Sequence, residues 1–198
     1  MSLKNPADVQ PLFVTKENKF LWDISRDGRF VLLAKEGGTT GISDLWIQPL
    51  QGHEAPWQYL ETGFQKGGAR FSPNTRWVAY QADESRTEVY VESFPERQRR
   101  SQVSTAGGAQ PRWRRDGKEL FYIGPDARLM AVPVKTEGDF EAGIPTPLFH
   151  LPASMVTNVV TAYDVDPRGQ RFLIGDVARP AIRSPIVVVL NWTEALKK

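Results

Sequence analysis

Short runs of alternating apolar and polar residues, separated by polar turns, recur along the whole chain. Four segments share one plan, in which a short apolar strand is followed by a turn rich in Gly, Pro, Asn or Asp and then by a second apolar strand. These segments are Trp22–Ala34, Ala69–Gln81, Pro111–Ile123 and Tyr163–Gly175. Alternation with a period of two is typical of β-strands, and such turns join neighbouring strands. The pattern therefore predicts four antiparallel hairpins.

The spacing of these hairpins indicates the architecture. When they are aligned on the turn residues Gly28, Thr75, Gly117 and Gly169, they lie 47, 42 and 52 residues apart. Each is followed by a third apolar strand, expected at residues 44–50, 88–94, 128–134 and 186–192. Fourth strands are expected at residues 56–60, 99–104 and 146–151. Four short antiparallel strands with a period near 45 residues are typical of β-propeller blades, so we expect an all-β propeller.

The last repeat lacks a fourth strand of its own. Residues 11–15 (PLFVT) are similar to residues 147–151 (PLFHL), which are an expected fourth strand. We therefore expect residues 11–15 to complete the last blade and close the ring, since closure removes exposed strand edges. This interpretation gives one domain over residues 1–198, with blades at about 20–60, 68–104, 110–151 and 161–192 plus 11–15. If the four blades do not close, we expect a homodimer to cover the open edges.

The fixed distance from each turn predicts which side chains are buried. One set of equivalent positions on the first strands comprises Ile24, Phe71, Trp113 and Val165. A second set on the second strands comprises Leu32, Ala79, Phe121 and Leu173. Because side chains on a strand alternate between its two faces, both sets are expected to be buried between blades.

Several of these segments resemble a known family. The phrases FSPNTRWVAY, EVYVESFP, QPRWRRDGKELFYI and VVVLNWTEALKK are similar to TolB-like β-propeller repeats. They are most similar to the C-terminal propeller of bacterial proteins in which such repeats follow a serine/threonine kinase domain. The sequence departs from the family at Asn74-Thr75, where Asp-Gly is usual. The resemblance implies a sensor or protein-interaction module, a ring that can contain more than four blades, and a periplasmic or other extracytoplasmic location.

Charge and composition exclude several classes of partner and site. The chain has 25 basic and 23 acidic residues in 198 and no cysteine. So balanced a charge does not favour nucleic acid, although Arg97, Arg99 and Arg100 form a local basic run. Disulfides and thiol chemistry are excluded. No apolar run of about 20 residues predicts a membrane span, and residues 1–10 lack the apolar core of a signal peptide.

Residues that could carry catalysis are few. His53 and His150 are expected in a connection and on an outer strand, and no G-x-S-x-G motif occurs. Asp164 and Asp166 lack the remaining ligands of a calcium loop, so a turn-capping role is favoured. The glycine pairs at 37–38, 67–68 and 107–108 are expected in connecting loops. We therefore expect no enzyme activity, no cofactor and no metal.

One set of equivalent charged positions is the candidate site. Propeller channels are lined by first strands, and the position before each predicted core residue is charged: Asp23, Arg70, Arg112 and Asp164. One interpretation, which we favour, is mutual pairing of Asp23 with Arg70 and of Arg112 with Asp164. The other is recognition of a carboxylate or peptide end by arginine. Residues of the loops that enter the first strands would form a rim on the same face: Lys19, Gln65, Lys66 and Gln110.

These observations predict a non-catalytic propeller that binds a protein, peptide or small ligand at one face of the ring. It would be the sensing part of a larger bacterial signalling protein. Two alternatives are an accessory propeller of a hydrolase or peptidase, and a partial propeller that assembles with a second copy. Fold by itself does not decide among these functions.

Overall fold

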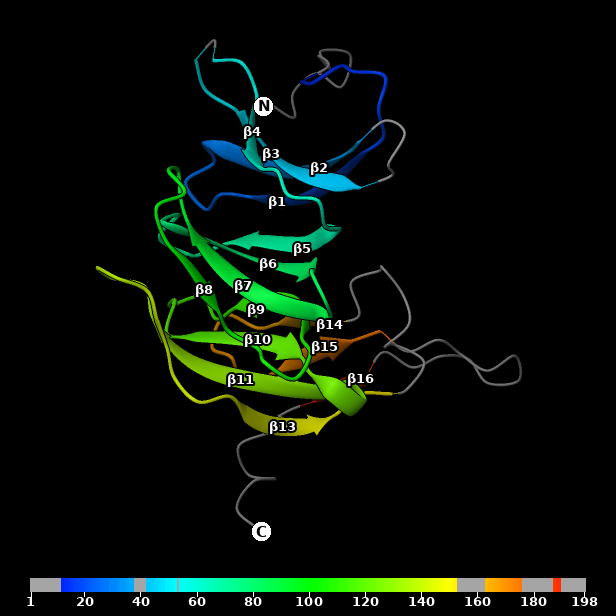
Figure 1. The fold of residues 1–198 in the computed structure, drawn as a ribbon. Helices are drawn as coiled ribbons and strands as arrows, with labels where there is room; N and C mark the ends of the chain where they lie inside the picture. Colours follow the sequence, from blue (N-terminus) through cyan, green and yellow to red (C-terminus); the bar gives the residue numbers. More distant parts are fainter. Residues whose placement is uncertain (1–11, 38–41, 53, 153–162, 176–186, 190–198) are drawn as a thin grey trace.

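The structure is a computed structural model and describes residues 12–37, 42–52, 54–152, 163–175 and 187–189. The described residues form four antiparallel sheets that follow one another in sequence order (Figure 1). Blade 1 consists of β1 (Lys19–Ile24), β2 (Phe30–Glu36), β3 (Ser43–Pro49) and β4 (Trp57–Leu60). Blade 2 consists of β5 (Lys66–Phe71), β6 (Trp77–Asp83), β7 (Thr87–Ser93) and β8 (Arg100–Gln102). The all-β prediction with four-stranded blades is confirmed.

The second half repeats this plan with small variations. Blade 3 consists of β9 (Ala109–Trp113), β10 (Glu119–Ile123), the short 3-10 helix η1 (Pro125–Ala127), β11 (Arg128–Lys135), β12 (Glu141–Ala142) and β13 (Thr146–His150). The two-residue strand β12 was not predicted and pairs with the end of β11. Blade 4 consists of β14 (Tyr163–Val165), β15 (Phe172–Ile174) and β16 (Val187–Val189). Among the residues that the structure describes, no helix is long and apolar enough to cross a membrane.

All four hairpins use the same turn. In blade 1 the N–H of Gly28 donates to Ser25 O at 2.8 Å, and the N–H of Ser25 donates to Phe30 O at 2.8 Å. The same two bonds recur in the other blades, around Thr75, Gly117 and Gly169. These aligned residues have φ between 57° and 73°. In the two Asp-Gly pairs only the glycine has a positive φ, because the loop is longer than a two-residue turn.

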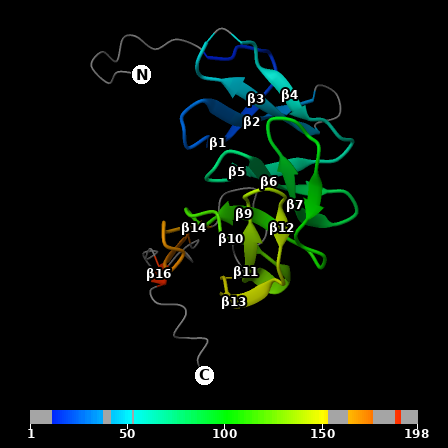
Figure 2. The same cartoon turned by 90° about the vertical axis from the view of Figure 1, so that its left-hand side faces the viewer.

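The strand register is also shared. Each charged first-strand position lies opposite the predicted second-strand core residue, giving the pairs Asp23–Leu32, Arg70–Ala79, Arg112–Phe121 and Asp164–Leu173. In Figure 2, β1, β5, β9 and β14 follow one another along one side of the molecule. The first strands of all four blades therefore line the same side, as in a propeller.

Three apolar clusters fill the spaces between successive blades. Leu32 packs with Phe71 between blades 1 and 2, and Ala79 packs with Trp113 between blades 2 and 3. Phe121 belongs to the cluster between blades 3 and 4, against which the partly buried Val165 packs. The second-strand position thus faces the next blade and the first-strand position faces the preceding one.

This rule explains two core predictions that were wrong. Ile24 and Leu173 are each 51% exposed, whereas Phe71 is 6% exposed and Leu32 is fully buried. Ile24 faces away from blade 2, and Leu173 faces away from blade 3. Blades 1 and 4 are the first and last of the described blades and pack on blades 2 and 3, so no described neighbouring blade covers either residue.

The predicted closure by residues 11–15 is also not found. Pro11 lies outside the described residues, and residues 12–15 form no strand. Phe13 instead packs on Trp46 of β3, with ring centroids 6.1 Å apart. Trp46 lies opposite Leu33, on the face of blade 1 that points away from blade 2. The segment therefore covers part of the outer face of blade 1. Of the expected strand at 186–192, the structure describes only β16.

Candidate functional site

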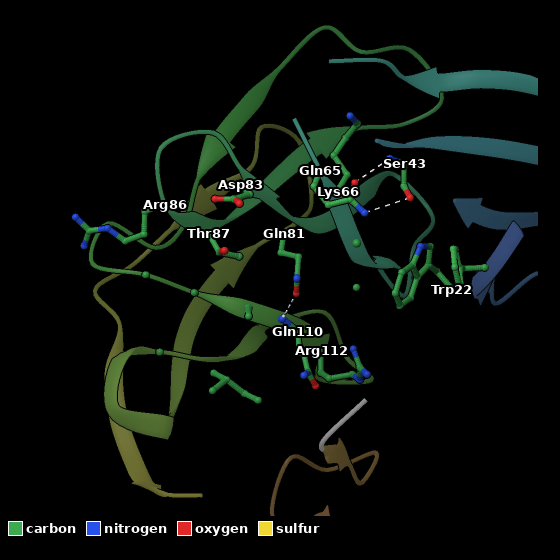
Figure 3. A pocket seen from close by; sticks show the side chains of 18 of the residues that line it. Trp22, Ser43, Gln65, Lys66, Gln81, Asp83, Arg86, Thr87, Gln110 and Arg112 are labelled. Atoms are coloured by element: carbon green, nitrogen blue, oxygen red, sulfur yellow. Dashed lines mark hydrogen bonds between the residues drawn. The ribbon is translucent and has the colours of Figure 1, made fainter. Parts of the chain in front are cut away.

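A groove of about 680 Å³ crosses blades 1, 2 and 3. It lies where the first strands β1, β5 and β9 begin or run, and where the second strands β2, β6 and β10 end. Figure 3 shows it from close by. Side chains that line it include Phe20, Trp22, Gln65, Gln81, Asp83, Arg86, Gln110 and Arg112. This volume is within the range of pockets that hold small molecules or short peptide segments.

Glycines let two side chains lie directly against the strand backbone in this groove. Gly67 and Gly68 belong to β5, not to a connecting loop as expected, and Gly68 has a φ of +61°. A Cβ at Gly67 would lie 3.3 Å from the Trp22 ring, and one at Gly68 would lie 3.1 Å from Gln81 Oε1. The strand pairing also shifts between Gly67 and Arg70, which is a β-bulge. Bulges of this kind re-aim side chains beside binding sites.

Two glutamines connect neighbouring blades at the groove. Gln81 Oε1 accepts a hydrogen bond of 2.8 Å from the backbone N–H of Gln110, which itself has a φ of 53°. Gln65 Oε1 accepts the N–H of Ser43 at 2.9 Å, and its Nε2 donates to Ser43 Oγ at 3.2 Å. Gln65 and Gln110 were predicted as rim residues, and both do line the groove. Part of their polar capacity is used to hold one blade to the next.

The mouth of the groove carries exposed charges. Asp83 ends β6, and the side chains of Asp83 and Arg86 both lie at the groove (Figure 3). The Arg86 Nε lies 4.0 Å from Oε1 of the buried Glu88. That carboxylate in turn accepts the N–H of Gly107, at 2.9 Å from Oε1. The mouth therefore offers one exposed anion and one exposed cation close to backbone groups.

One of the two predicted charge pairs is present. Arg112 is 5% exposed, and its Nε lies 4.0 Å from Asp164 Oδ1. Its guanidinium lies 5.7 Å from the centre of the Tyr163 ring. Tyr163 in turn donates from its hydroxyl to Gln110 O at 3.0 Å. Arg112 also lines the groove, so it links blade 3 to blade 4 beneath the groove surface.

The other predicted pair, Asp23 with Arg70, has no direct contact among the described atoms. Asp23 Oδ2 accepts the backbone N–H of Phe71 at 2.9 Å, and Arg70 donates to the carbonyls of Trp22 and Ala69. Burial raises the pKa of Asp23. Burial and the nearby charge of Arg112 lower the pKa of Arg70 to about 10. Asp23 and Arg70 therefore interact electrostatically, but each holds blades 1 and 2 together by a hydrogen bond to a backbone group.

The two predicted rim lysines bind the backbone. Lys66 is 2% exposed; its Nζ donates to Phe64 O at 2.7 Å and lies 3.1 Å from Asp44 Oδ1. Lys19 occupies the equivalent position in blade 1 and donates to Thr15 O and Glu17 O. Sequence reasoning identified both as polar loop-end residues. It could not show that neighbouring carbonyls would enclose their ammonium groups.

Other sequence features have structural partners. Asp166 Oδ1 accepts the N–H of Gln170 at 2.8 Å, which is the predicted turn-capping role. His150, on β13, contacts Arg128 and the Asp126 carbonyl. Arginines of the basic run pair with acids, namely Arg97 with Glu92, Arg99 with Asp139 and Arg100 with Glu84. Within the described ranges, no group of three or more His, Cys, Asp or Glu residues could hold a metal ion. His53 lies outside the described residues.

Comparison with known proteins places this fold among solved propeller-containing structures. The chain is similar to TolB from Acinetobacter baumannii, with a TM-score of 0.53 and 16% identity over 76% of this chain and 35% of that one. It is similar to a Mycobacterium tuberculosis puromycin-hydrolyzing peptidase, with a TM-score of 0.51 and 19% identity over 77% and 27%. A putative 6-phosphogluconolactonase from Bacteroides uniformis gives a TM-score of 0.48 and 17% identity over 79% and 47%.

The similarities to TolB and to the puromycin-hydrolyzing peptidase support a TolB-like propeller fold. The chain spans only 27 to 47% of the length of the three solved chains. No family model matches the sequence, and no curated protein matches it.

Several groove residues were not predicted from the sequence. Trp22, Gln81, Asp83 and Arg86 line the groove but were not among the predicted site residues. The signal that could have identified them is the pair of glycines at 67 and 68, which only Ala69 separates from the charged position Arg70 of the first strand. Conversely, Asp23, Arg70 and Asp164 do not line the groove.

Proposed function

We propose that this chain is a non-catalytic part of a β-propeller that binds a short peptide segment in the groove across blades 1 to 3. The observation that carries the proposal is the composition of the groove, in which an indole, amide side chains and glycine backbone lie together. Ligand-binding sites in proteins are mostly concave, with an apolar surface and a few oriented polar groups. The groove also combines contributions from three blades.

The available hydrogen-bonding groups match a peptide backbone. Gln81 Oε1 is occupied by Gln110 N, whereas its Nε2 donates to no group among the described residues and can donate to a ligand carbonyl. Asp83 can accept an amide N–H or pair with a basic side chain. Arg86 can bind a carboxylate, because guanidinium binds carboxylates in bidentate geometry. A ligand with alternating donors and acceptors uses all three.

We place this function in a larger signalling protein, in line with the resemblance to propellers that follow kinase domains. The alternative, an accessory propeller of a peptidase, rests on the similarity to 27% of the puromycin-hydrolyzing peptidase. A non-catalytic role is favoured here because the ring nitrogens of His150 contact Arg128 and Asp126 on an outer edge rather than a serine.

The test is selection of binding peptides from a random library, followed by nitrogen–proton correlation spectra of the labelled protein. We expect selected peptides to shift the amide signals of Gly67, Gly68 and Gly107, which form part of the groove. Arg86→Ala and Asp83→Ala should weaken binding about tenfold each, the usual loss for one charged hydrogen bond. Arg99→Ala is the matched control, because this exposed arginine pairs with Asp139 outside the groove. Shifts confined to residues outside the groove would contradict the proposal.

A further inference from the structure

The faces at the two ends of the blade array carry the same positions that are buried inside it. Leu173 in blade 4 is equivalent to Leu32, Ala79 and Phe121, each of which is fully buried against the next blade. Ile24 in blade 1 is equivalent to Phe71 and Trp113, which are buried against the preceding blade. Leu173 and Ile24 are nevertheless 51% exposed. Each end thus exposes one half of an inter-blade contact.

A polar group at the blade 4 end repeats this situation. In blade 1, Asp23 Oδ1 accepts a hydrogen bond of 2.9 Å from the N–H of the next residue, Ile24. Asp23 Oδ2 accepts a second hydrogen bond of 2.9 Å, from the N–H of Phe71 in blade 2. Asp164 in blade 4 accepts the N–H of Val165 at Oδ1, also at 2.9 Å. Its Oδ2 has no hydrogen-bond partner among the described residues, and its side chain is 70% exposed. Blade 4 therefore lacks both the apolar and the polar contact that blade 2 gives to blade 1.

The missing apolar half on each end is available on the other end of the same chain. Blade 4 needs a first strand with an apolar residue at the position of Phe71, and blade 1 exposes Ile24 at that position. Leu21 lies beside it on the same face and is 67% exposed. We propose that blade 4 of one copy binds blade 1 of a second copy, head to tail, with Leu173 against Ile24. An interface between two different faces closes into a ring if the rotation permits and otherwise extends.

The segment that already lies on blade 1 leaves room for this contact. Phe13 packs on Trp46 of β3, whereas Ile24 and Leu21 are on β1. The first strand therefore keeps exposed apolar side chains at Leu21 and Ile24, beside the segment whose Leu12 and Val14 are exposed as well. In the interior interfaces the first strand supplies Phe71 and Trp113 at the same place.

Sedimentation velocity over a range of protein concentrations tests the interface with two variants, Ile24→Asp and Leu173→Asp. Both residues are exposed, so both variants should fold, which thermal unfolding checks. The wild type should self-associate, and each variant alone should be monomeric, because every contact in it includes one altered face. An equimolar mixture of the two variants should regain one intact contact and form a heterodimer. A monomeric wild type, or a mixture that stays monomeric, would overturn the proposal.

The mixing experiment also separates this interface from a symmetric one. If blade 1 bound blade 1 of the second copy, Leu173→Asp would associate as well as the wild type, and that result would overturn the head-to-tail arrangement. A third variant, Asp164→Asn, tests the polar contact. In the proposed dimer Asp164 lies near Asp23 of the second copy, and the amide keeps an acceptor while removing the like charge. We expect association to tighten about tenfold, and a weaker association would contradict this placement.

Discussion

The interior and the ends of the blade array are built from the same sequence positions but differ in what surrounds them. Trp113 in blade 3 is 9% exposed, and its Nε1 donates to Arg70 O at 3.1 Å. Ile24, the equivalent residue of blade 1, is 51% exposed. Their strands have the same register and turn. Burial of a side chain in this repeat therefore depends on the neighbouring blade, since each blade alone cannot cover its own faces.

The largest effect should come from deleting an interior contact. We expect Trp113→Ala to lower the free energy of unfolding by about 3–5 kcal/mol, because it opens a cavity in the blade 2–blade 3 cluster. Ile24→Ala at the equivalent end position should cost less than about 1 kcal/mol in the monomer. Urea unfolding at a concentration where the protein is monomeric measures both. Equal losses would show that the two positions are not distinguished by a neighbouring blade.

The next largest difference in the free energy of unfolding is expected between substitutions at two equivalent lysines. Lys66 has a fully buried side chain and lies 3.1 Å from Asp44, whose side chain is 19% exposed. Replacing it by methionine leaves that carboxylate without its cation, and we expect a loss of about 3 kcal/mol. Lys19→Met removes hydrogen bonds to Thr15 O and Glu17 O and a cation–π contact with Phe13, so a loss of about 1 kcal/mol is expected. Chemical unfolding of the two variants side by side decides, and a larger loss for Lys19→Met would contradict the comparison.

A smaller effect should not depend on the position of the blade in the array. Thr75 has a φ of 57°, in the region where its aligned counterparts are glycine. We expect Thr75→Gly to stabilise the protein by about 1 kcal/mol, because a β-branched residue is strained there. Gly28→Ala should destabilise by a similar amount; a Cβ at Gly28 has no atom within 4 Å, so only the backbone conformation is tested. Melting temperatures that change in the same direction for both variants would contradict a shared local turn.

The smallest effect is a difference in pH dependence between two aspartates. Burial raises the pKa of Asp23 above 3.8, so its ionised form is disfavoured in the folded state. The hydrogen bond from Arg114 lowers the pKa of Asp116 below 3.8, so its ionised form is favoured. As the pH falls from about 7 to about 4, the wild type should gain stability relative to Asp23→Asn. It should lose stability relative to Asp116→Asn only below about pH 4, as the folded carboxyl becomes protonated. Denaturation midpoints from about pH 7 down to about pH 2 measure both trends, and parallel trends would refute them.

Much of the blade itself could be predicted from the sequence. The strands, the shared register and the residues at the four turns follow from alternation with a period of two and from turn composition, both of which are local properties. The alignment on Gly28, Thr75, Gly117 and Gly169 coincides with the four residues of positive φ at the hairpins. The candidate site was less predictable. Arg112, Gln65, Gln110 and Lys66 do line the groove, but Lys66 is enclosed by carbonyls and a carboxylate.

The repeat, the antiparallel order of its strands and the side chains that share a face follow from the sequence alone, because they depend on neighbours along the chain. Packing between blades decides which equivalent positions are buried, how Asp23 and Arg70 find backbone partners, and where glycine backbone, Trp22 and Gln81 together form a groove. Those outcomes depend on contacts between blades about 45 residues apart in sequence. They also depend on whether a neighbouring blade exists at all, which the pattern within one repeat does not encode.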